Sequence, residues 1–403
     1  MLPHNWRVLN FSRMIFLAAL ALLAGCKSAP RDNSGVPESE QNAQLIERPS
    51  PDFTPSPAPS LRPIPPVTNA VMPTVSAPRT NLATGTKTNF FTAPKTNLAS
   101  FPTPLKMIHR PVPPTFTSLN HWAADYGLNP AMKLTSLPVL TYSMSSRHGT
   151  LVLEVGTREA TWRGMSLHLG FAPEMVDGQL CVHGLDIIKT LSPLMVDAPP
   201  NFAPHKTICL DPGHGGINGG TVSIDGRAEK EFTLDWARRL GNLLSASGWT
   251  VFFTRTNDLD VALSNRVAVA EAHHADLFLS LHFNSSAPDH RQSGLETYCL
   301  TPTGMPSTLT RGYADPWTDH YPNNAHDAEN IQLATRLQAA LLPASGEEDR
   351  GIRRARFMGV LLGQRRPAVL IEGGYLSNKI EAEKIGNGDF RQKLAEAVAS
   401  ALR

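Results

Sequence analysis

The chain has 403 residues, enough for two ordinary domains, and a formal net charge of only +2 at pH 7. Because the charge is so small and no basic run is interleaved with aromatic residues, nucleic-acid binding is excluded as a class of function. Prolines are dense in the first part of the chain, so only the remainder has the composition of folded domains.

A secretion signal is predicted at the N-terminus. Two arginines precede an apolar run from Met14 to Leu23, which is too short to remain as a membrane-spanning helix. The run ends in Leu-Ala-Gly-Cys26, which resembles the lipobox of bacterial lipoproteins, in which the cysteine becomes the acylated first residue. An ordinary signal peptide with an incidental cysteine is the alternative. Residues 1–26 are therefore predicted to be a lipoprotein signal peptide, with a lipid on Cys26 as the membrane anchor.

The segment after this anchor predicts where the protein works. Lys27 follows the cysteine instead of an aspartate, which in enteric-type bacteria favours the periplasmic face of the outer membrane within the cell envelope. Residues 27–110 are rich in Pro, Ser, Thr and Asn and cannot bury enough apolar surface to fold. Such a disordered linker, at about 3 Å per residue where it is extended, reaches on the order of 100 Å from a membrane into the cell wall.

Residues 111–198 are predicted to form a small β-rich accessory domain. Short apolar runs at Thr150–Gly156, Ala160–Gly164 and Met175–Val182 alternate with turn signals, and Asp177-Gly178 indicates a hairpin. The order of these elements resembles the small repeat domain at the amino end of copper amine oxidases. No copper is inferred, because His168 and His183 do not form a metal cluster by their spacing. The ligand of this domain is left open.

Residues 205–403 change to alternating strand and helix patterns. Strands are predicted at Lys206–Leu210, Thr250–Thr254, Asp276–Leu281 and Ala368–Ile371. Amphipathic helices are predicted at about Lys230–Ala246, Ser264–His273, Glu329–Leu342 and Phe390–Leu402. This alternation predicts an α/β fold whose mainly parallel twisted sheet has helices on both faces.

The predicted strands deliver chemically capable residues to one edge of that sheet. His214 follows the first strand, His282 ends the third and Glu372 ends the last, and ligands of open α/β sheets gather at such carboxyl ends. Two histidines and one glutamate are a recognised catalytic zinc set, and Glu229, at the start of a helix, is the best candidate for the carboxylate. Taken one at a time, the three residues also have purely structural explanations. His214 could be a turn histidine, His282 the end of a strand, and Glu229 a charge favoured at a helix N-terminus.

A family resemblance covers nearly all of residues 205–403. The stretches "ICLDPGHGG", "EKEFTL", "LFLSLHFNSS", "GLETY", "EDRGIRRARFMGVL" and "AVLIEGGYLSN" together resemble the zinc-dependent N-acetylmuramoyl-L-alanine amidases of the amidase_3 type, which act on the bacterial cell wall. The resemblance implies that His214, Glu229 and His282 bind Zn²⁺ and that Glu372 is the catalytic glutamate. It also implies peptidoglycan as the substrate, cleaved between the lactyl group of N-acetylmuramic acid and the L-alanine of the stem peptide.

The residue chemistry agrees with this role. Glu372, which is not itself a ligand, is expected to accept a proton from the attacking water and pass it to the leaving nitrogen. Two further residues are substrate-binding candidates: Asn284, which also suits a supporting role behind the ligands, and Arg350, which suits either a surface turn or a contact with a stem-peptide carboxylate.

The segment from Thr301 to Asp327 departs from the plainer family pattern, because it is long and rich in Pro, Gly and Asn and contains aromatic residues. Loops of this length are usually functional or disordered. Some amidase relatives carry an inserted segment that covers the zinc until a partner releases it, so the loop is expected to be a lid or a wall of the substrate groove, and a protein activator is a possible partner.

Two alternatives to the amidase remain. The chain could be a non-catalytic lipoprotein that binds peptidoglycan, or a zinc peptidase that cleaves within the stem peptide. Glycan and stem-peptide preference and oligomeric state are not indicated by the sequence.

Overall fold

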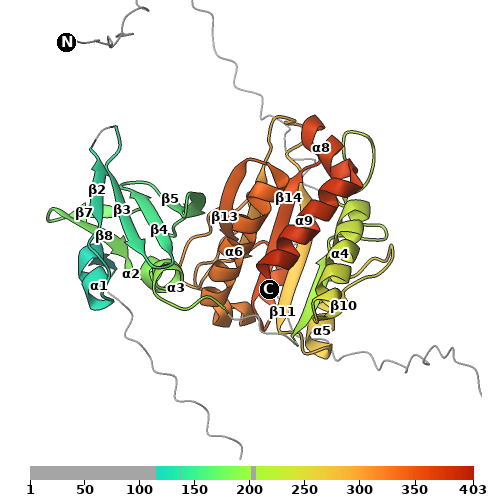
Figure 1. Ribbon diagram of the computed structural model, residues 1–403, viewed down its shortest axis with the longest axis horizontal. Coiled ribbons are helices and arrows are strands. Elements are labelled where there is room, and N and C mark those ends of the chain that lie inside the picture. Colours follow the sequence, from blue (N-terminus) through green and yellow to red (C-terminus); the bar gives the residue numbers. More distant parts are fainter. Residues whose placement is uncertain (1–114, 137, 201–205) are drawn as a thin grey trace, which may run out of the picture. The chain divides into compact units, whose positions relative to one another are not determined.

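The structure is a computed structural model that describes residues 115–136, 138–200 and 206–403 (Figure 1). The predicted signal peptide over residues 1–26, the predicted anchor Cys26 and the predicted linker over residues 27–110 lie outside the described residues. No helix within the described ranges is both long and apolar enough to cross a membrane.

Residues 207–403 form an α/β arrangement. Its strands are β9 (Thr207–Pro212), β10 (Thr250–Phe253), β11 (Leu277–Asn284), β12 (Leu295–Leu300), β13 (Asp349–Ala355) and β14 (Ala368–Tyr375). Its α-helices are α4 (Glu229–Ala246), α5 (Leu263–Ala272), α6 (Asp327–Ser345), α7 (Gly359–Leu362), α8 (Lys379–Gly386) and α9 (Gly388–Ala401).

The sheet of this region is mainly parallel, in the order β10-β9-β11-β14-β12-β13. Neighbouring strands are parallel except for β12 and β14, which pair antiparallel. Strand β12 follows β11 through residues 285–294, which contain no helix. Because a parallel strand would need a long crossover, usually a helix, β12 runs opposite to β11 and therefore to β14. The predicted fold class, an α/β fold with helices flanking a large central sheet, is confirmed.

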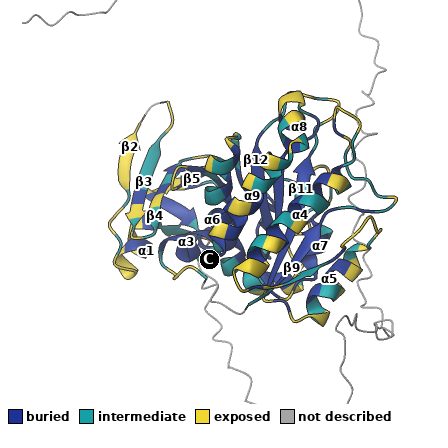
Figure 2. Cartoon of the chain, turned by 45° about the vertical axis from the view of Figure 1, so that its right-hand side comes forward, coloured by how far each residue is buried: buried dark blue, intermediate teal, exposed yellow. Residues whose placement is uncertain are grey.

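The central strands are buried on both faces, which explains their almost continuous apolar sequences (Figure 2). Alternate residues of β11 enter two different cores. Leu279 packs with residues of α4, α6 and α9, whereas Phe278 packs with residues of α5 and α7. Because successive strand residues point to opposite faces, each layer of helices has its own set of side chains to cover.

The N-terminal described region is rich in strands. These are β1 (Phe116–Ser118), β2 (Met132–Thr135), β3 (Thr141–Ser146), β4 (Gly149–Glu154), β5 (Glu159–Trp162), β6 (Met165–His168), β7 (Glu174–Val176) and β8 (Gln179–His183). Its helices are α1 (Leu119–Asp125), α2 (Gly184–Asp186), a π-helix at Ile187–Leu191 and α3 (Ser192–Met195).

Strands β2 to β6 form an antiparallel meander in chain order. Strands β7 and β8 form a hairpin whose two turn residues, Asp177 and Gly178, have φ of 50° and 75°. Positive φ at both positions is what a tight two-residue hairpin turn requires, so the predicted hairpin is confirmed.

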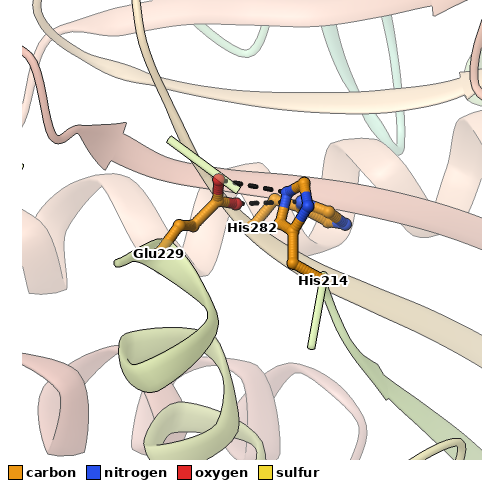
Figure 3. Close-up of side chains that lie close together, drawn as sticks. All are labelled: His214, Glu229 and His282. Atoms are coloured by element: carbon orange, nitrogen blue, oxygen red, sulfur yellow. Dashed lines mark hydrogen bonds and ion pairs between the residues drawn. The ribbon is translucent and has the colours of Figure 1, made fainter. Parts of the chain in front are cut away.

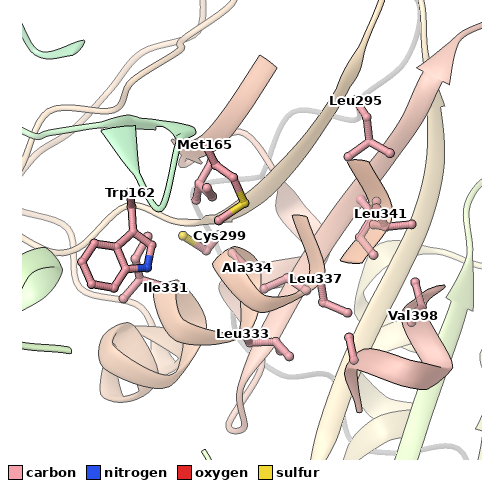
Figure 4. Close-up of a cluster of buried hydrophobic side chains, with 14 of the residues drawn as sticks. Trp162, Met165, Leu295, Cys299, Ile331, Leu333, Ala334, Leu337, Leu341 and Val398 are labelled. Carbon is pink, nitrogen blue, oxygen red and sulfur yellow. The ribbon is translucent and has the colours of Figure 1, made fainter. Parts of the chain in front are cut away.

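The two regions share one sheet and one hydrophobic core. Strand β13 pairs in parallel with β6 through Ile352 and Leu167, which joins the meander to the α/β sheet. In the same core, Trp162 and Met165 lie near Cys299 and Ile331 of the α/β region (Figure 4). A hydrogen bond also joins the two regions, because Asp349 accepts from the Ser166 amide at 2.6 Å.

Candidate active site

A tight turn after β9 presents His214. Its φ is 60°, in the left-handed region where histidine is tolerated better than most residues, and the two glycines that follow also have positive φ. Gly213 is needed for a different reason, because a Cβ there would lie 2.2 Å from the imidazole of His282. A Cβ on Gly220 would similarly lie 2.6 Å from Glu229 Oε2. The backbone therefore passes so close to these side chains that only glycine fits.

Buried arginine side chains hold this turn in place through hydrogen bonds to its carbonyl groups. Arg266 donates to the carbonyls of Pro212 and His214, each at 2.9 Å, and Arg255 donates to the carbonyl of Gly213 at 2.7 Å. Arg266 also forms an ion pair with Asp211 at 2.7 Å. Burial by itself would raise the pKa of Asp211, but this ion pair, with hydrogen bonds from neighbouring hydroxyls, holds the pKa below its usual range.

The structure brings His214, Glu229 and His282 together (Figure 3). Glu229, in the first turn of α4, points one oxygen at each histidine: Oε2 lies 3.1 Å from His214 Nε2 and Oε1 lies 3.0 Å from His282 Nδ1. One potential ligand atom from each residue lies within 4.8 Å of the others. Two imidazole nitrogens and a carboxylate oxygen, held on a backbone of glycines, fit a divalent metal ion such as zinc.

Neighbouring groups orient these three side chains. Asn218 Oδ1 accepts from the Gly220 amide at 3.1 Å and lies 2.9 Å from His214 Nδ1, so that nitrogen carries the proton and Nε2 keeps its lone pair in the neutral ring. Both oxygens of Glu229 also accept backbone amides, from Thr221 at 3.1 Å and from Phe283 at 3.0 Å. These hydrogen bonds fix the positions of the His214 and Glu229 side chains.

The pKa shifts follow from this arrangement. Burial would raise the pKa of Glu229, but the two histidines outweigh it and the pKa lies far below its ordinary value. Burial alone would lower the pKa of His214, yet the Glu229 carboxylate raises it. For His282 burial prevails and the pKa is lowered, which keeps that imidazole neutral, the form that binds metals.

Glu372 lies beside this group on the next strand. It is the register partner of His282 in the parallel pair β11/β14, and it is only 6% exposed. Among the described residues, its Oε2 has no hydrogen-bond partner. Burial, together with the negative charge of Glu229, raises the pKa of Glu372 to about 8. A buried carboxyl poised near neutral pH suits a group that takes up and releases a proton.

All four residues line one cavity of about 380 Å³, within the size range of small-ligand sites. Arg311 and Tyr313, from the segment Thr301 to Asp327, also line it. This segment therefore forms part of the cavity wall. It is held by the buried Arg356, which donates to the carbonyls of Pro302 and Met305, both at 2.8 Å.

The two substrate-binding candidates lie in different places. Asn284 lines the cavity but is only 3% exposed, and its amide is engaged with Glu296 and Arg311. Arg350 is not among the cavity-lining residues; it donates to Gln292 and Ser293, both at 3.1 Å, and its guanidinium lies 5.0 Å from the ring centroid of Tyr375.

The sequence analysis missed two residues of this site, Asn218 and Arg311. Asn218 follows the histidine turn by four positions, and a polar side chain that close to a proposed ligand is a signal that could have identified it. Arg311 lies in a loop without periodicity, and only its neighbour Gly312, which allows a sharp turn, marked the position.

The fold and the cavity together define an α/β protein with a His–Glu–His group at the carboxyl edge of its sheet, able to hold a metal ion. Residues 208–403 match the family profile described as N-acetylmuramoyl-L-alanine amidase. The chain is 30% identical over 213 residues to the uncharacterised protein YqiI of Bacillus subtilis, a match that covers 53% of this chain and 90% of YqiI. The chain belongs to the N-acetylmuramoyl-L-alanine amidase family through this region.

Two further relatives are similar over the same region. The N-acetylmuramoyl-L-alanine amidase LytC of Bacillus subtilis is 33% identical over 196 residues, which cover 48% of this chain but only 34% of LytC. The solved catalytic domain of CwlV, an N-acetylmuramoyl-L-alanine amidase from Bacillus (Paenibacillus) polymyxa var. colistinus, is 30% identical, with a TM-score of 0.41 and coverage of 49% of this chain and 95% of that chain. The chain thus spans about a third of the length of LytC.

Proposed function

We propose that this protein is an N-acetylmuramoyl-L-alanine amidase that hydrolyses the amide between the lactyl group of N-acetylmuramic acid and the L-alanine of peptidoglycan stem peptides. Membership of the amidase family supports the reaction. The observation that carries the proposal is the combination, in one cavity, of the His–Glu–His group with a buried carboxyl, one oxygen of which has no hydrogen-bond partner among the described residues.

His214, Glu229 and His282 would hold a zinc ion as the cofactor. When bound, the ion supplies a Lewis acid that polarises the amide carbonyl and lowers the pKa of water to about 7. Their donor atoms and mutual distances support this ligand set.

Glu372 would be the catalytic acid and base. An amide is a poor electrophile, and its nitrogen leaves only when it is protonated. Glu372 would accept a proton from the attacking water and deliver it to the departing nitrogen of L-alanine, a role worth about 10² to 10⁴ in rate. Its burial and its register position beside His282 support this assignment.

The wider organisation is part of the proposal. The catalytic domain would span residues 205–403, preceded by an accessory domain over 111–198, a linker over 27–110 and a lipoprotein signal over 1–26. A lipid on Cys26 would anchor the protein in the cell envelope, at the periplasmic face of the outer membrane. The wall segment Thr301 to Asp327 could then be an autoinhibitory lid that a protein activator opens.

Mass spectrometry of the products released from purified peptidoglycan tests the activity. The full chain is incubated with zinc, with a chelator, and as the Glu372→Ala variant with zinc. Free stem peptides that begin at L-alanine, and that disappear in both controls, are the expected result. Fragments cut within the stem would favour a zinc peptidase instead. Binding to the wall with no release in any reaction would favour the non-catalytic lipoprotein.

A further inference from the structure

Arg311 is one of two residues of the segment Thr301 to Asp327 that line the cavity, the other being Tyr313. It has a φ of 48°, a left-handed conformation that is unfavourable for arginine, and Gly312 next to it has a φ of 77°. Its Nη2 donates to Asn284 Oδ1 at 3.0 Å, and its guanidinium lies 5.5 Å from the ring centroid of Phe357. Backbone strain of this kind persists where the surrounding structure holds the side chain in place.

The contacts of Asn284 show why this position is fixed. Its Nδ2 donates to Glu296 Oε1 at 2.6 Å, which leaves Oδ1 to face Arg311. The other end of the loop is secured by Arg356, which forms an ion pair with Asp315 and is only 4% exposed. Asn284 therefore holds the guanidinium of Arg311, and Arg356 holds the loop that carries it.

Among the described residues, Arg311 has no ion pair shorter than 4.0 Å. Its Nη2 lies 4.0 Å from Glu296 Oε1. Glu296 also pairs with Arg353 at 3.4 Å and with Arg350 at 3.7 Å, so one carboxylate faces three guanidinium groups. By contrast, Arg266, which also lines the cavity, forms a close ion pair with Asp211 at 2.7 Å.

Arg311 is also accessible from the cavity. Its side chain is 32% exposed and lines the same cavity as His214, Glu229, His282 and Glu372. Arg350, which the sequence suggested for a stem-peptide carboxylate, does not line it. A preorganised guanidinium beside the reacting groups, without a short ion pair among the described residues, offers the bidentate hydrogen bonding that a carboxylate accepts.

We propose that Arg311 binds a carboxylate of the stem peptide and so determines which stem chemistry the enzyme prefers. The inference rests on the proposed function, because it names the substrate group that this cavity recognises. Glu372 and the His–Glu–His group act on the amide at the start of the stem, and Arg311 receives an acidic group further along the same peptide. Asn284 and Glu296 are then positioning residues for Arg311.

The test uses a panel of muramyl peptides in which each stem carboxylate is converted to a carboxamide, one at a time. The full-length zinc-loaded protein is compared with Arg311→Gln and Arg311→Lys. For the wild type, amidation at one position is expected to lower kcat/KM by about 10- to 100-fold, the range of one charge-assisted contact. Arg311→Gln is expected to lose this discrimination, and Arg311→Lys to retain part of it.

A second readout does not depend on hydrolysis. Titration calorimetry of the free stem peptides against metal-free protein is expected to show the same preference for the carboxylate, again lost in Arg311→Gln. The matched control is Arg291→Gln, since the Arg291 side chain is 91% exposed and does not line the cavity, and it should behave as wild type in both assays.

Three results would overturn the proposal: a wild type that tolerates every amidation, an Arg311→Gln variant that keeps the wild-type pattern, or one that loses the same factor on every peptide. The last would assign Arg311 a structural role. If the wild type hydrolyses none of the peptides yet still binds the carboxylate forms through Arg311, the amidase proposal fails and the carboxylate site stands.

Discussion

Glu372 and Glu296 are register partners on the antiparallel strands β14 and β12, both are almost fully buried, and their surroundings are opposite. Glu296 accepts hydrogen bonds from Asn284 at 2.6 Å and from Tyr298 at 2.8 Å, and has arginines nearby. Glu372 has an oxygen without any partner among the described residues. One carboxylate is thus built for stability and the other is left available for chemistry.

Replacing Glu372 should separate catalysis from folding. Glu372→Gln is expected to lower kcat by about 10² to 10⁴ because the proton acceptor is lost. Zinc content should stay at the wild-type level, since Glu372 is not one of the proposed ligands, and the free energy of unfolding should not fall. Product release assays, metal analysis and urea unfolding check these three points. A loss of zinc together with activity would show that Glu372 acts as a ligand.

Replacing Glu296 should have the opposite effect. Glu296→Gln removes a buried charge that faces three arginines, so the free energy of unfolding is expected to fall by about 3 kcal/mol, as when one partner of a buried ion pair is removed. Denaturant unfolding of the metal-free protein measures this change, with Glu372→Gln as the matched control. Equal stabilities of the two variants would contradict the assigned roles.

The raised pKa of Glu372 predicts how stability depends on pH in the metal-free protein. The folded-state pKa is about 8 and the ordinary value is 4.5, so between these values the folded state holds a proton that the unfolded state has released. The contribution is fully present below pH 4.5 and is lost as the pH rises through 8. Each pH unit in that window should cost up to about 1.4 kcal/mol.

Urea unfolding between pH 5 and 8.5 tests this dependence, with Glu372→Gln measured alongside. Because other groups titrate in the same window, the difference between the two proteins is the relevant quantity. The wild type should lose stability relative to the variant as the pH rises. Parallel curves would mean that Glu372 is ionised in the folded protein across the whole range.

The close approach of Gly213 to His282 gives a steric test of the metal site. Gly213→Ala adds no backbone strain of the left-handed kind, yet its Cβ would lie 2.2 Å from the imidazole and would force the ring to move. Zinc content and activity are both expected to drop by at least about tenfold, as when the support of a metal ligand is lost. Metal analysis and product release measure this.

Gly219→Ala is the matched control for this substitution. Its Cβ would meet only the Cβ of Ala228 at 3.5 Å, an ordinary contact, and this glycine also lacks a positive φ. It should keep wild-type zinc content and activity. If Gly213→Ala binds zinc as well as Gly219→Ala does, the His282 ring is not a ligand in the observed position.

The sequence predicted what depends on local pattern. The apolar strands before His214, His282 and Glu372, and the helix that begins at Glu229, follow from hydrophobic runs and turn signals, and the structure has them in those places. Strand β13 was missed because its sequence, Asp-Arg-Gly-Ile-Arg-Arg-Ala, has the charges of a surface segment. Arg353 is half-buried and Arg354 is buried because residues distant in the sequence pair with them, Glu296 with Arg353 and Thr190 with Arg354.

Arg311 was not predictable for a related reason. Its place in the cavity depends on Arg356, which lies beyond α6 and fixes the wall segment through Asp315 and two carbonyls. No periodicity in the segment encodes such an anchor, so the sequence indicates a long loop and not the direction in which its side chains point.

The pairing of β6 with β13 has a practical consequence for anyone who trims the protein. A fragment that began near residue 206 would keep all the groups proposed for catalysis, but it would expose the outer edge of β13, with Ile352 and its backbone donors and acceptors bare. Trp162 and Met165 would no longer cover Cys299 and Ile331. An uncovered strand edge beside an apolar patch invites other chains to add to it. Poor solubility of the shortened protein would then reflect the loss of the contact between β6 and β13, and not a defect in the catalytic groups.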